Sequence, residues 1–367
     1  ALALEALPKE SSGRAQGFMT TAFHSGVLIG PSIGGLIIDY IHWRAVFFFL
    51  IPIALCGMVL TLINRMKGNV PAPIAVTDAQ RSIDYLGALL LIAATTSLIA
   101  CVDHRIIESL TPALRVALVV TFVIVIGGFI YRERMTPSPI LDLSLFRIRM
   151  FTLSSVALLL VGVAQVMIGF VLPFYLQDVL HLRPSFIGLL FVSAPIFTVT
   201  LSPLVGWAVD KMGPRVPATV GIAFLAAAGF FGSFLRSDSH WSAAVGVLAL
   251  WGLATALFFT ANHTAMITSV PSEHRGVATG AIYVTFGLGT TFGVSLGTML
   301  LTMAFRHYTG DPTATPTAAN PAIFVRSMNF SFMVGGSMAL LAMLSSALRG
   351  RRKPGALADP HRVGAIG

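Results

Sequence analysis

The stretch PKESSGRAQGFMTTAFHSGVLIGPSIG, residues 8–34, recurs in part as PSEHRGVATGAIYVTFGLGTTFGVSLG, residues 271–297, at a fixed offset of 263 residues. The matches begin in a polar loop, where Pro8, Glu10, Gly13, Ala15 and Gly17 correspond to Pro271, Glu273, Gly276, Ala278 and Gly280. They continue into an apolar segment, where Gly26, Gly30 and Gly34 correspond to Gly289, Gly293 and Gly297. The repeated unit is a polar loop followed by an apolar helix with a glycine ridge at every fourth residue. A duplicated helix of this kind predicts a protein built from two related halves, an architecture found mainly in membrane transporters.

Composition places the chain in a membrane. It is 55% hydrophobic and only 11% charged, with a mean hydropathy of +0.83, whereas an ordinary soluble domain carries about 25% charged residues. The net charge of +9 comes from loops between apolar runs and not from one basic face, so we expect no nucleic-acid partner. Cys56 and Cys101 lie inside apolar runs, without disulfide or metal-ligand spacing. We therefore expect no metal and no other cofactor.

Apolar runs of roughly 18 to 25 residues, the length of a membrane-spanning helix, recur along the chain. They predict an all-α integral membrane protein with the lipid bilayer as its solvent. We place ten spans at residues 17–38, 45–63, 84–102, 113–131, 151–176, 186–208, 216–235, 241–261, 276–304 and 324–348.

Basic residues then predict the orientation. Most of the 24 lysines and arginines fall in the loops on one side of these spans, and the richer side of a membrane protein faces the cytoplasm. We expect both ends of the chain on that side, in a multi-pass protein of the cell inner (plasma) membrane. The basic cluster Arg349, Arg351, Arg352 and Lys353 is interpreted as a stop-transfer anchor facing anionic lipid.

The repeat also predicts the domain organisation. Span one recurs in span nine, eight spans later, whereas two six-helix halves in direct succession would give an offset of six. We therefore expect the last two helices of a first half in 1–66, a linker and two inserted helices in 67–135, a complete second half in 136–350 and a cytoplasmic tail in 351–367. On this interpretation the first four helices are missing, and we expect the chain by itself not to transport.

Two motifs resemble those of a known family. The stretch GVLIGPSIGG, with Gly26, Gly30, Pro31, Gly34 and Gly35, resembles the antiporter signature of the major facilitator superfamily. The stretch GWAVDKMGPR, with Gly206, Asp210, Lys211, Gly213 and Arg215, resembles that family's loop motif G-x-x-x-D-[RK]-x-G-x-R. Three further stretches, at 42–52, 141–151 and 170–180, are similar to the fourteen-helix drug:proton antiporter branch, which has two extra helices between its halves. The resemblance implies a major facilitator type helical bundle and multidrug efflux.

Each motif has a physical interpretation. Glycine at every fourth residue makes a flat helix face that a partner helix can approach closely, and we hypothesise that this ridge slides against a helix of the other half during transport. The alternative is static packing. In the second copy Val294 and Thr298 replace Pro31 and Gly35, so the Gly-Pro signature is confined to the first. For the loop motif we hypothesise that Asp210, Lys211 and Arg215 form a charge latch at the cytoplasmic face; the alternative is a solvated basic loop.

Polar residues inside spans are candidates for a substrate path, here Gln165, Asn262 and His263, with His24 a further polar residue inside a span. The alternative is that they bond neighbouring helices. The resemblance implies that the proton-coupling residues lie on first-half helices one to four, so none is assigned.

The predicted function is proton-coupled export of amphipathic small molecules by a monomer, energised by the proton gradient. A selective metabolite exporter is an alternative. A membrane enzyme or non-transporting sensor is disfavoured because the sequence shows no convergent acids, histidines or cysteines. It also lacks a G-x-x-x-x-G-K-[ST] nucleotide loop.

Overall fold

A computed structural model describes residues 12–42, 44–66, 84–102, 107, 110–136, 142–271, 274–317 and 319–350. Within these ranges the fold is helical, with no strand. The start of the repeated loop (Pro8, Glu10), its counterpart Glu273, the linker 67–83 and the tail 351–367 lie outside the described residues.

Every predicted span coincides with a described helix, except that the span at 186–208 coincides with two. The helices are α2 (Ser12–Tyr40), α3 (Ala45–Met66), α4 (Tyr85–Val102), α6 (Pro112–Met135), α7 (Arg149–Phe174, extended by a π-helical turn Tyr175–Val179), α8 (Pro184–Phe191), α9 (Ser193–Met212), α10 (Arg215–Gly232), α11 (Trp241–Thr268), α12 (Arg275–Thr309) and α13 (Pro321–Leu348). Counting α8 and α9 as one rod, eight of these are long and apolar enough to cross a membrane, namely all but α2 and the shorter apolar α4. The all-α membrane bundle predicted from the sequence is therefore confirmed.

The span predicted at 186–208 is broken into two helices. Helix α8 ends at Phe191 and α9 begins at Ser193, whose hydroxyl donates to the carbonyl of Leu190 at 2.6 Å. Just after the break, the main chain of Ala194 lies against Gly252 of α11, where no Cβ would fit. The break therefore sits beside a close approach of α9 and α11.

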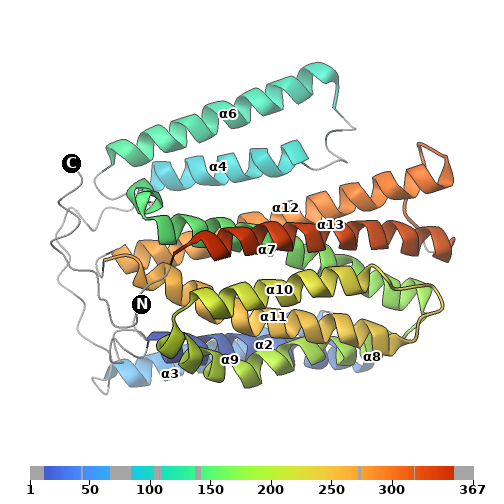
Figure 1. The fold of residues 1–367 in the computed structure, drawn as a ribbon, viewed down its shortest axis with the longest axis horizontal. Helices are drawn as coiled ribbons and strands as arrows, with labels where there is room; N and C mark the ends of the chain where they lie inside the picture. The colour runs from blue at the N-terminus through green and yellow to red at the C-terminus, as the bar shows by residue number, and fades with distance from the viewer. Residues whose placement is uncertain are drawn as a thin grey trace.

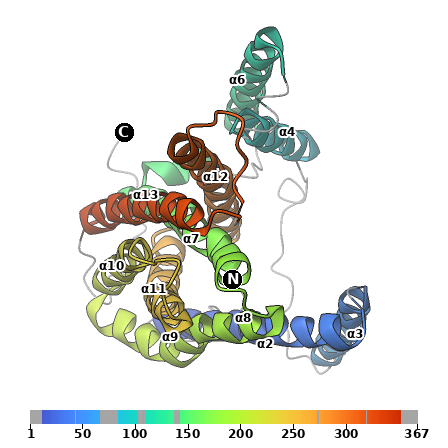
Figure 2. The same cartoon turned by 90° about the vertical axis from the view of Figure 1, so that its right-hand side faces the viewer.

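Helices α7 to α13 form the main bundle, and α2 lies along its edge (Figures 1 and 2). Helix α2 packs along α9 and also meets α8 and α11, whereas α3 contacts α2 at the rim. The most buried side chains come from the main bundle, among them Phe151, Leu158, Ile222, Leu248 and Phe332. The predicted second half is thus the packed core of the chain, and α2, which the repeat assigns to a first half, packs against it.

The inserted helices α4 and α6 form a hairpin on the other side of the bundle, where α4 touches α12 (Figure 2). Asp84 holds the two helices together at one end. Its carboxylate accepts the main-chain N–H of Gly87 at 2.9 Å, which caps α4, and pairs with the guanidinium of Arg132 on α6 at 3.3 Å. The side chain of Asp84 is buried, so this pair is shielded from solvent better than an exposed one.

Candidate functional site

The contact between α2 and α9 brings two motif glycines face to face. A Cβ at Gly13 would lie 2.5 Å from the carbonyl oxygen of Gly206, and a Cβ at Gly206 would lie 2.5 Å from that of Gly13. One turn further along α2, a Cβ at Gly17 would lie 2.6 Å from the carbonyl of Ser202. Distances of this kind leave no room for a side chain, so glycine is required here for the close approach of the two backbones.

Asp210 adds hydrogen bonds to this contact between α2 and α9. Its carboxylate oxygens accept the main-chain N–H of Gly13 at 2.7 Å and that of Arg14 at 3.1 Å, at the start of α2. The guanidinium Nε of Arg14 lies 3.7 Å from the same carboxylate. The Asp210 side chain is 10% exposed. A carboxylate at a helix N-terminus is stabilised by the unpaired N–H groups and the helix dipole, so the loop motif of the second half caps a helix of the first half.

The predicted pairing of Asp210 with Lys211 and Arg215 is absent from the described residues. The ammonium group of Lys211 lies 4.0 Å above the ring of Trp207, one turn back on α9. Gly213 ends α9 with φ +81°, and Arg215 begins α10 beyond that turn. The cation that reaches Asp210 is instead Arg14, because helix packing brings α2 against the carboxylate.

The glycine ridge of α12 packs inside its own half. A Cβ at Gly293 would lie 2.7 Å from the carbonyl oxygen of Val163 on α7, and one at Gly289 would collide with the carbonyl of Leu159. Gly297 lies against Met167 of the same helix. The ridge is therefore a close contact between α12 and α7, two helices of the predicted second half, which agrees with the alternative of static packing for this copy.

The ridge of α2 is in a different environment. A Cβ at Gly26, Gly30 or Gly34 would meet no atom of the described residues within 4 Å. Helix α2 continues through residues 31–35, but the side-chain surroundings of Pro31 and Gly35 lie outside the described part of the structure. The glycines that touch the other half are Gly13 and Gly17, which sequence reasoning had placed in the loop of the repeat and had not linked to this contact.

A stripe of four residues on α11 faces α2 and α7. Trp251, Thr255, Phe259 and His263 are spaced four apart and so share one helix face. The amide nitrogen of Gln165 on α7 reaches the hydroxyl of Thr255 at 3.4 Å, and the ring of Phe259 packs edge-on against Phe286 of α12 at 5.1 Å. This spacing was visible in the sequence, but only His263 had been singled out.

The end of the stripe that carries Phe259 and His263 meets α2. The side-chain amide of Gln16 lies 3.3 Å from Nδ1 of His263. The ring of Phe259 lies between two imidazoles, 5.5 Å from His263 and 6.4 Å from His24 between centroids. His24 bonds the carbonyl of Thr20 on its own helix at 2.9 Å. Two histidines, one from each half, thus meet around a single aromatic ring.

The predicted path residues separate into two environments. His263 belongs to the stripe and Gln165 contacts it, whereas Asn262 is fully buried and its amide donates to the carbonyl of Ser154 on α7 at 3.3 Å. Asn262 therefore joins two helices of the same half, as the alternative interpretation proposed for polar residues inside spans.

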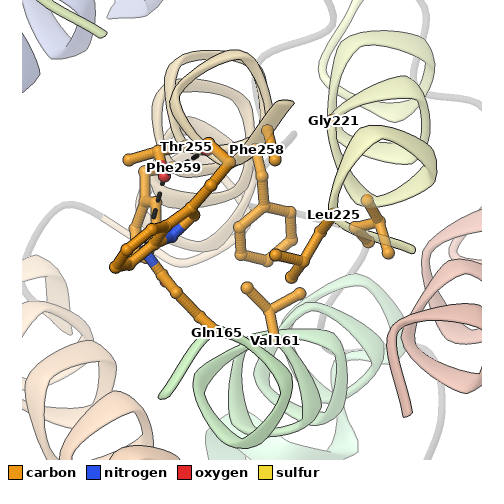
Figure 3. Close-up of a pocket in the computed structure, with 10 residues that line it drawn as sticks. Val161, Gln165, Gly221, Leu225, Thr255, Phe258 and Phe259 are labelled. Atoms are coloured by element: carbon orange, nitrogen blue, oxygen red, sulfur yellow. Dashed lines mark hydrogen bonds between the residues drawn. The ribbon is translucent and has the colours of Figure 1, made fainter. Parts of the chain in front are cut away.

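A small hollow of about 10 Å³, room for about one water molecule, lies between α7, α10 and α11. Figure 3 shows Gln165 and Thr255 pointing toward each other at one side of it, with Phe258, Val161 and Leu225 at the other. Trp251 also lines the hollow. The indole N–H of Trp251 and the side-chain oxygen of Gln165 are buried without a hydrogen-bond partner in the described structure. The hollow is thus apolar, with one unused donor and one unused acceptor.

Arg349 follows α13 and is 2% exposed, with no hydrogen-bond partner for its guanidinium among the described residues. Burial lowers the pKa of this group to about 10. The expectation that Arg349 faces lipid is therefore wrong; the remaining residues of the basic cluster lie outside the described residues. In the part of the chain that the structure describes, no group of three or more His, Cys, Asp or Glu side chains could hold a metal ion.

Comparison with known proteins gives a family match over nearly all of the chain. The model of the Major Facilitator Superfamily matches residues 1–293 and, separately, residues 154–364. The second match begins in α7 and overlaps the first.

Several curated proteins are similar to the chain. It is 25% identical over 350 residues to the riboflavin transporter RibZ of Clostridioides difficile, covering 92% of this chain and 70% of that protein. It is 29% identical over 302 residues to the multidrug resistance protein Stp of Mycobacterium tuberculosis (82% and 55%). It is 28% identical over 288 residues to the tetracenomycin C resistance and export protein of Streptomyces glaucescens (77% and 51%). The chain thus spans between about half and 70% of the length of these relatives.

Proposed function

Because this chain belongs to the Major Facilitator Superfamily, we propose that it forms the second half, the two inserted helices and part of the first half of a proton-coupled exporter of amphipathic small molecules. Membership implies a multi-pass membrane transporter rather than an enzyme. The fourteen-helix drug:proton antiporter branch is supported by the hairpin of α4 and α6 between the halves and by relatives named for multidrug resistance and export. The whole protein would contain four further helices, sit in the inner membrane as a monomer with both chain ends cytoplasmic, and draw on the proton gradient.

The observation that carries this proposal is the capped contact between the halves. Asp210 of the second half holds the start of α2 of the first half through two main-chain hydrogen bonds. Hydrogen bonds to a charged group contribute about 1.5–3 kcal/mol each, which is enough to bias a two-state equilibrium by a factor of ten or more. In alternating access this contact would be closed when the cytoplasmic side is shut and broken when the halves rock apart.

The α11 stripe would then line the path between the halves. It lies where α2, α7 and α12 meet α11, and it carries polar and aromatic groups in the middle of a membrane bundle. Such groups inside spans mark substrate or ion pathways. His24 and His263 are titratable groups on opposite halves, and the stripe between them is apolar enough for an amphipathic molecule.

Transport in inside-out membrane vesicles with an acidified interior tests the proposal. The whole protein, with the helices encoded upstream, should accumulate a fluorescent cationic dye such as ethidium, and a protonophore should abolish the accumulation. Accumulation that survives collapse of the proton gradient would exclude proton coupling. The 367-residue chain prepared in the same way should give no accumulation; proton-driven transport by this chain alone would refute the interpretation of missing helices.

A selective metabolite exporter is the second candidate. It is favoured by the similarity to a protein named a riboflavin transporter over 92% of this chain. A resistance profile separates the two, because a multidrug exporter should protect cells against several chemically unrelated compounds and a selective one should not.

A further inference from the structure

We propose that His24 and His263 form a site for a single proton between α2 and α11, with Gln16 as the residue that positions His263. This inference deepens the proposed function, since it rests on proton-coupled export for its biological role. The site itself rests on the contacts of the two imidazoles, which come from helices that the repeat assigns to opposite halves.

The hydrogen bond of His24 leaves its ring able to accept a proton. Nδ1 of the ring lies 2.9 Å from the carbonyl oxygen of Thr20 on the same helix. A carbonyl oxygen can only accept, so Nδ1 carries the hydrogen and Nε2 is the free base of the neutral ring. A proton can therefore bind Nε2 without breaking the bond to Thr20.

His263 has the opposite arrangement. The side-chain amide nitrogen of Gln16 lies 3.3 Å from Nδ1 of His263, so in the neutral ring Nδ1 accepts and Nε2 carries the hydrogen. Nε2 of His263 and the amide oxygen of Gln16 are buried without a hydrogen-bond partner in the described structure. A half turn of the amide would bring this oxygen to Nδ1, where it can accept an N–H once the ring is protonated. Gln16 can thus pair with both forms of the ring, and its bond to the positive form is the stronger, charge-assisted one.

Phe259 places the two imidazoles close enough for their charges to interact. The ring of Phe259 lies 5.5 Å from that of His263 and 6.4 Å from that of His24 between centroids, and Phe259 is buried. Two positive charges on either side of a buried ring repel more strongly than two charges separated by water. A proton on one histidine therefore opposes a proton on the other, and the pair holds a single charge.

The other titratable groups on the helices packed around the pair leave this charge on the histidines. Within the helix bounds, α11 carries only His263 and α8 carries none. The remaining groups are Arg14, Asp39 and Tyr40 on α2, Cys56 and Arg65 on α3, Arg149 on α7, Asp210 and Lys211 on α9, Arg215 on α10, and Arg275, Tyr283, Arg306, His307 and Tyr308 on α12. Asp210 and Arg14 pair with each other at the start of α2. In the described structure the ring nitrogens of the pair bond only Thr20 and Gln16.

The position of the site links proton binding to movement of the helices. If α2 moves away from α11, the bond between Gln16 and His263 breaks, and a protonated ring loses its charge-assisted partner. A proton on His263 therefore favours the closed contact, and opening of the contact favours release of the proton, because the two equilibria are reciprocal.

Nitrogen-15 NMR of the purified chain, labelled at its histidines, tests the inference without any proton gradient. The signals of the two rings are identified by their loss in His24→Gln and in His263→Gln. At about pH 8 we expect the hydrogen of His24 on Nδ1 and that of His263 on Nε2. On acidification both rings should respond to one first step, and a second step should follow at least about one pH unit lower. Either single variant should leave one step for the remaining histidine.

Gln16→Leu tests the positioning role, because it removes the amide and keeps a side chain of similar size. The first step should then occur about one pH unit lower, since the bond to the positive ring is lost. His240→Gln is the matched control, because His240 is exposed at the start of α11; both steps should be unchanged. If His263→Gln fails to fold, as judged by thermal unfolding, His24→Gln and Gln16→Leu decide the question.

The outcomes for the site and for the proposed function are separate. Independent titration of the two histidines, or a first step that is unchanged in Gln16→Leu, would overturn the inference even if the whole protein exports dyes with protons. The expected titration in the chain, together with dye accumulation by the whole protein that survives collapse of the proton gradient, would uphold the proton site and reject the proposed function.

Discussion

The carboxylate of Asp210 accepts the main-chain N–H of Gly13 at 2.7 Å, although the two residues are 197 positions apart in sequence. Gly13 also faces Gly206, one turn before Asp210 on α9, with no space for a Cβ on either side. The backbone contact and the cap therefore depend on each other. The glycines let the helices approach, and this approach brings the helix N-terminus within reach of the carboxylate.

Asp210→Asn should loosen this contact. The amide can still accept one N–H but carries no charge, so we expect a loss of about 1–2 kcal/mol and roughly a tenfold rise in the population of separated halves. The measurement is disulfide formation between cysteines placed at Thr21 and Val199, after Cys56 and Cys101 are replaced by serine. The Thr21 hydroxyl and the Val199 carbonyl lie 3.3 Å apart across α2 and α9. The cross-linking yield should fall.

Asp238→Asn is the matched control for this experiment. Asp238 forms an ion pair with Arg236 in the exposed loop between α10 and α11, with both side chains more than 70% exposed. Its removal should leave the yield unchanged. A yield that also stays unchanged in Asp210→Asn would show that the cap does not hold the halves together.

The two glycine ridges should respond differently to the same substitution. Gly293→Leu places a side chain against the carbonyl of Val163 and should destabilise the chain by about 1–3 kcal/mol through overpacking. Gly30→Leu meets no described atom within 4 Å and should leave its thermal unfolding unchanged. In the whole protein we expect Gly30→Leu to insert normally and to abolish transport. Equal destabilisation of the chain by both variants would contradict this assignment.

Sequence predicted the helices well because apolar length alone decides where a chain can cross a membrane. It did not predict which glycines meet the other half. Glycine spacing shows that a close approach is allowed, but the partner depends on tertiary packing. The expected pairing of Asp210 with Lys211 failed for a similar reason: neighbours in sequence point to different sides of a helix, and Lys211 lies over Trp207. The contact between Gln165 and Thr255 was missed because it needs two helices in register.

The repeat and the structure together predict a second capped contact. Gly13 and Gly17 of α2 are packed against α9, whereas their counterparts Gly276 and Gly280 at the start of α12 meet no described atom within 4 Å of an added Cβ. By symmetry of the two halves, we expect α12 to receive a helix that ends in a G-x-x-x-D motif. Its aspartate would accept the N–H of Gly276.

Cysteine cross-linking in the whole protein checks this second contact. A cysteine at Gly280 should form a disulfide with one placed four residues before the glycine of that motif, matching the approach of Gly17 to Ser202. A cysteine at Ala278, which is buried on the opposite face of α12, should not. Cross-linking at Ala278 alone would place the partner helix on another face of α12.

Acid should separate the inserted helices. The main-chain N–H of Gly87, and then Arg132, lower the pKa of the Asp84 carboxyl below its usual 3.8 against the opposing effect of burial. A carboxyl with a lowered folded-state pKa stabilises the fold above its unfolded pKa, and this contribution is lost as the pH falls through the lower value. Spin labels at the exposed Tyr85 and Tyr131 should therefore keep one distance at pH 5–7 and spread below about pH 3.8. In Asp84→Asn the label-to-label distances should be widely distributed at every pH, without a transition, whereas Asp238→Asn should behave like the unchanged chain. A transition that persists in Asp84→Asn would assign the pH dependence to another group.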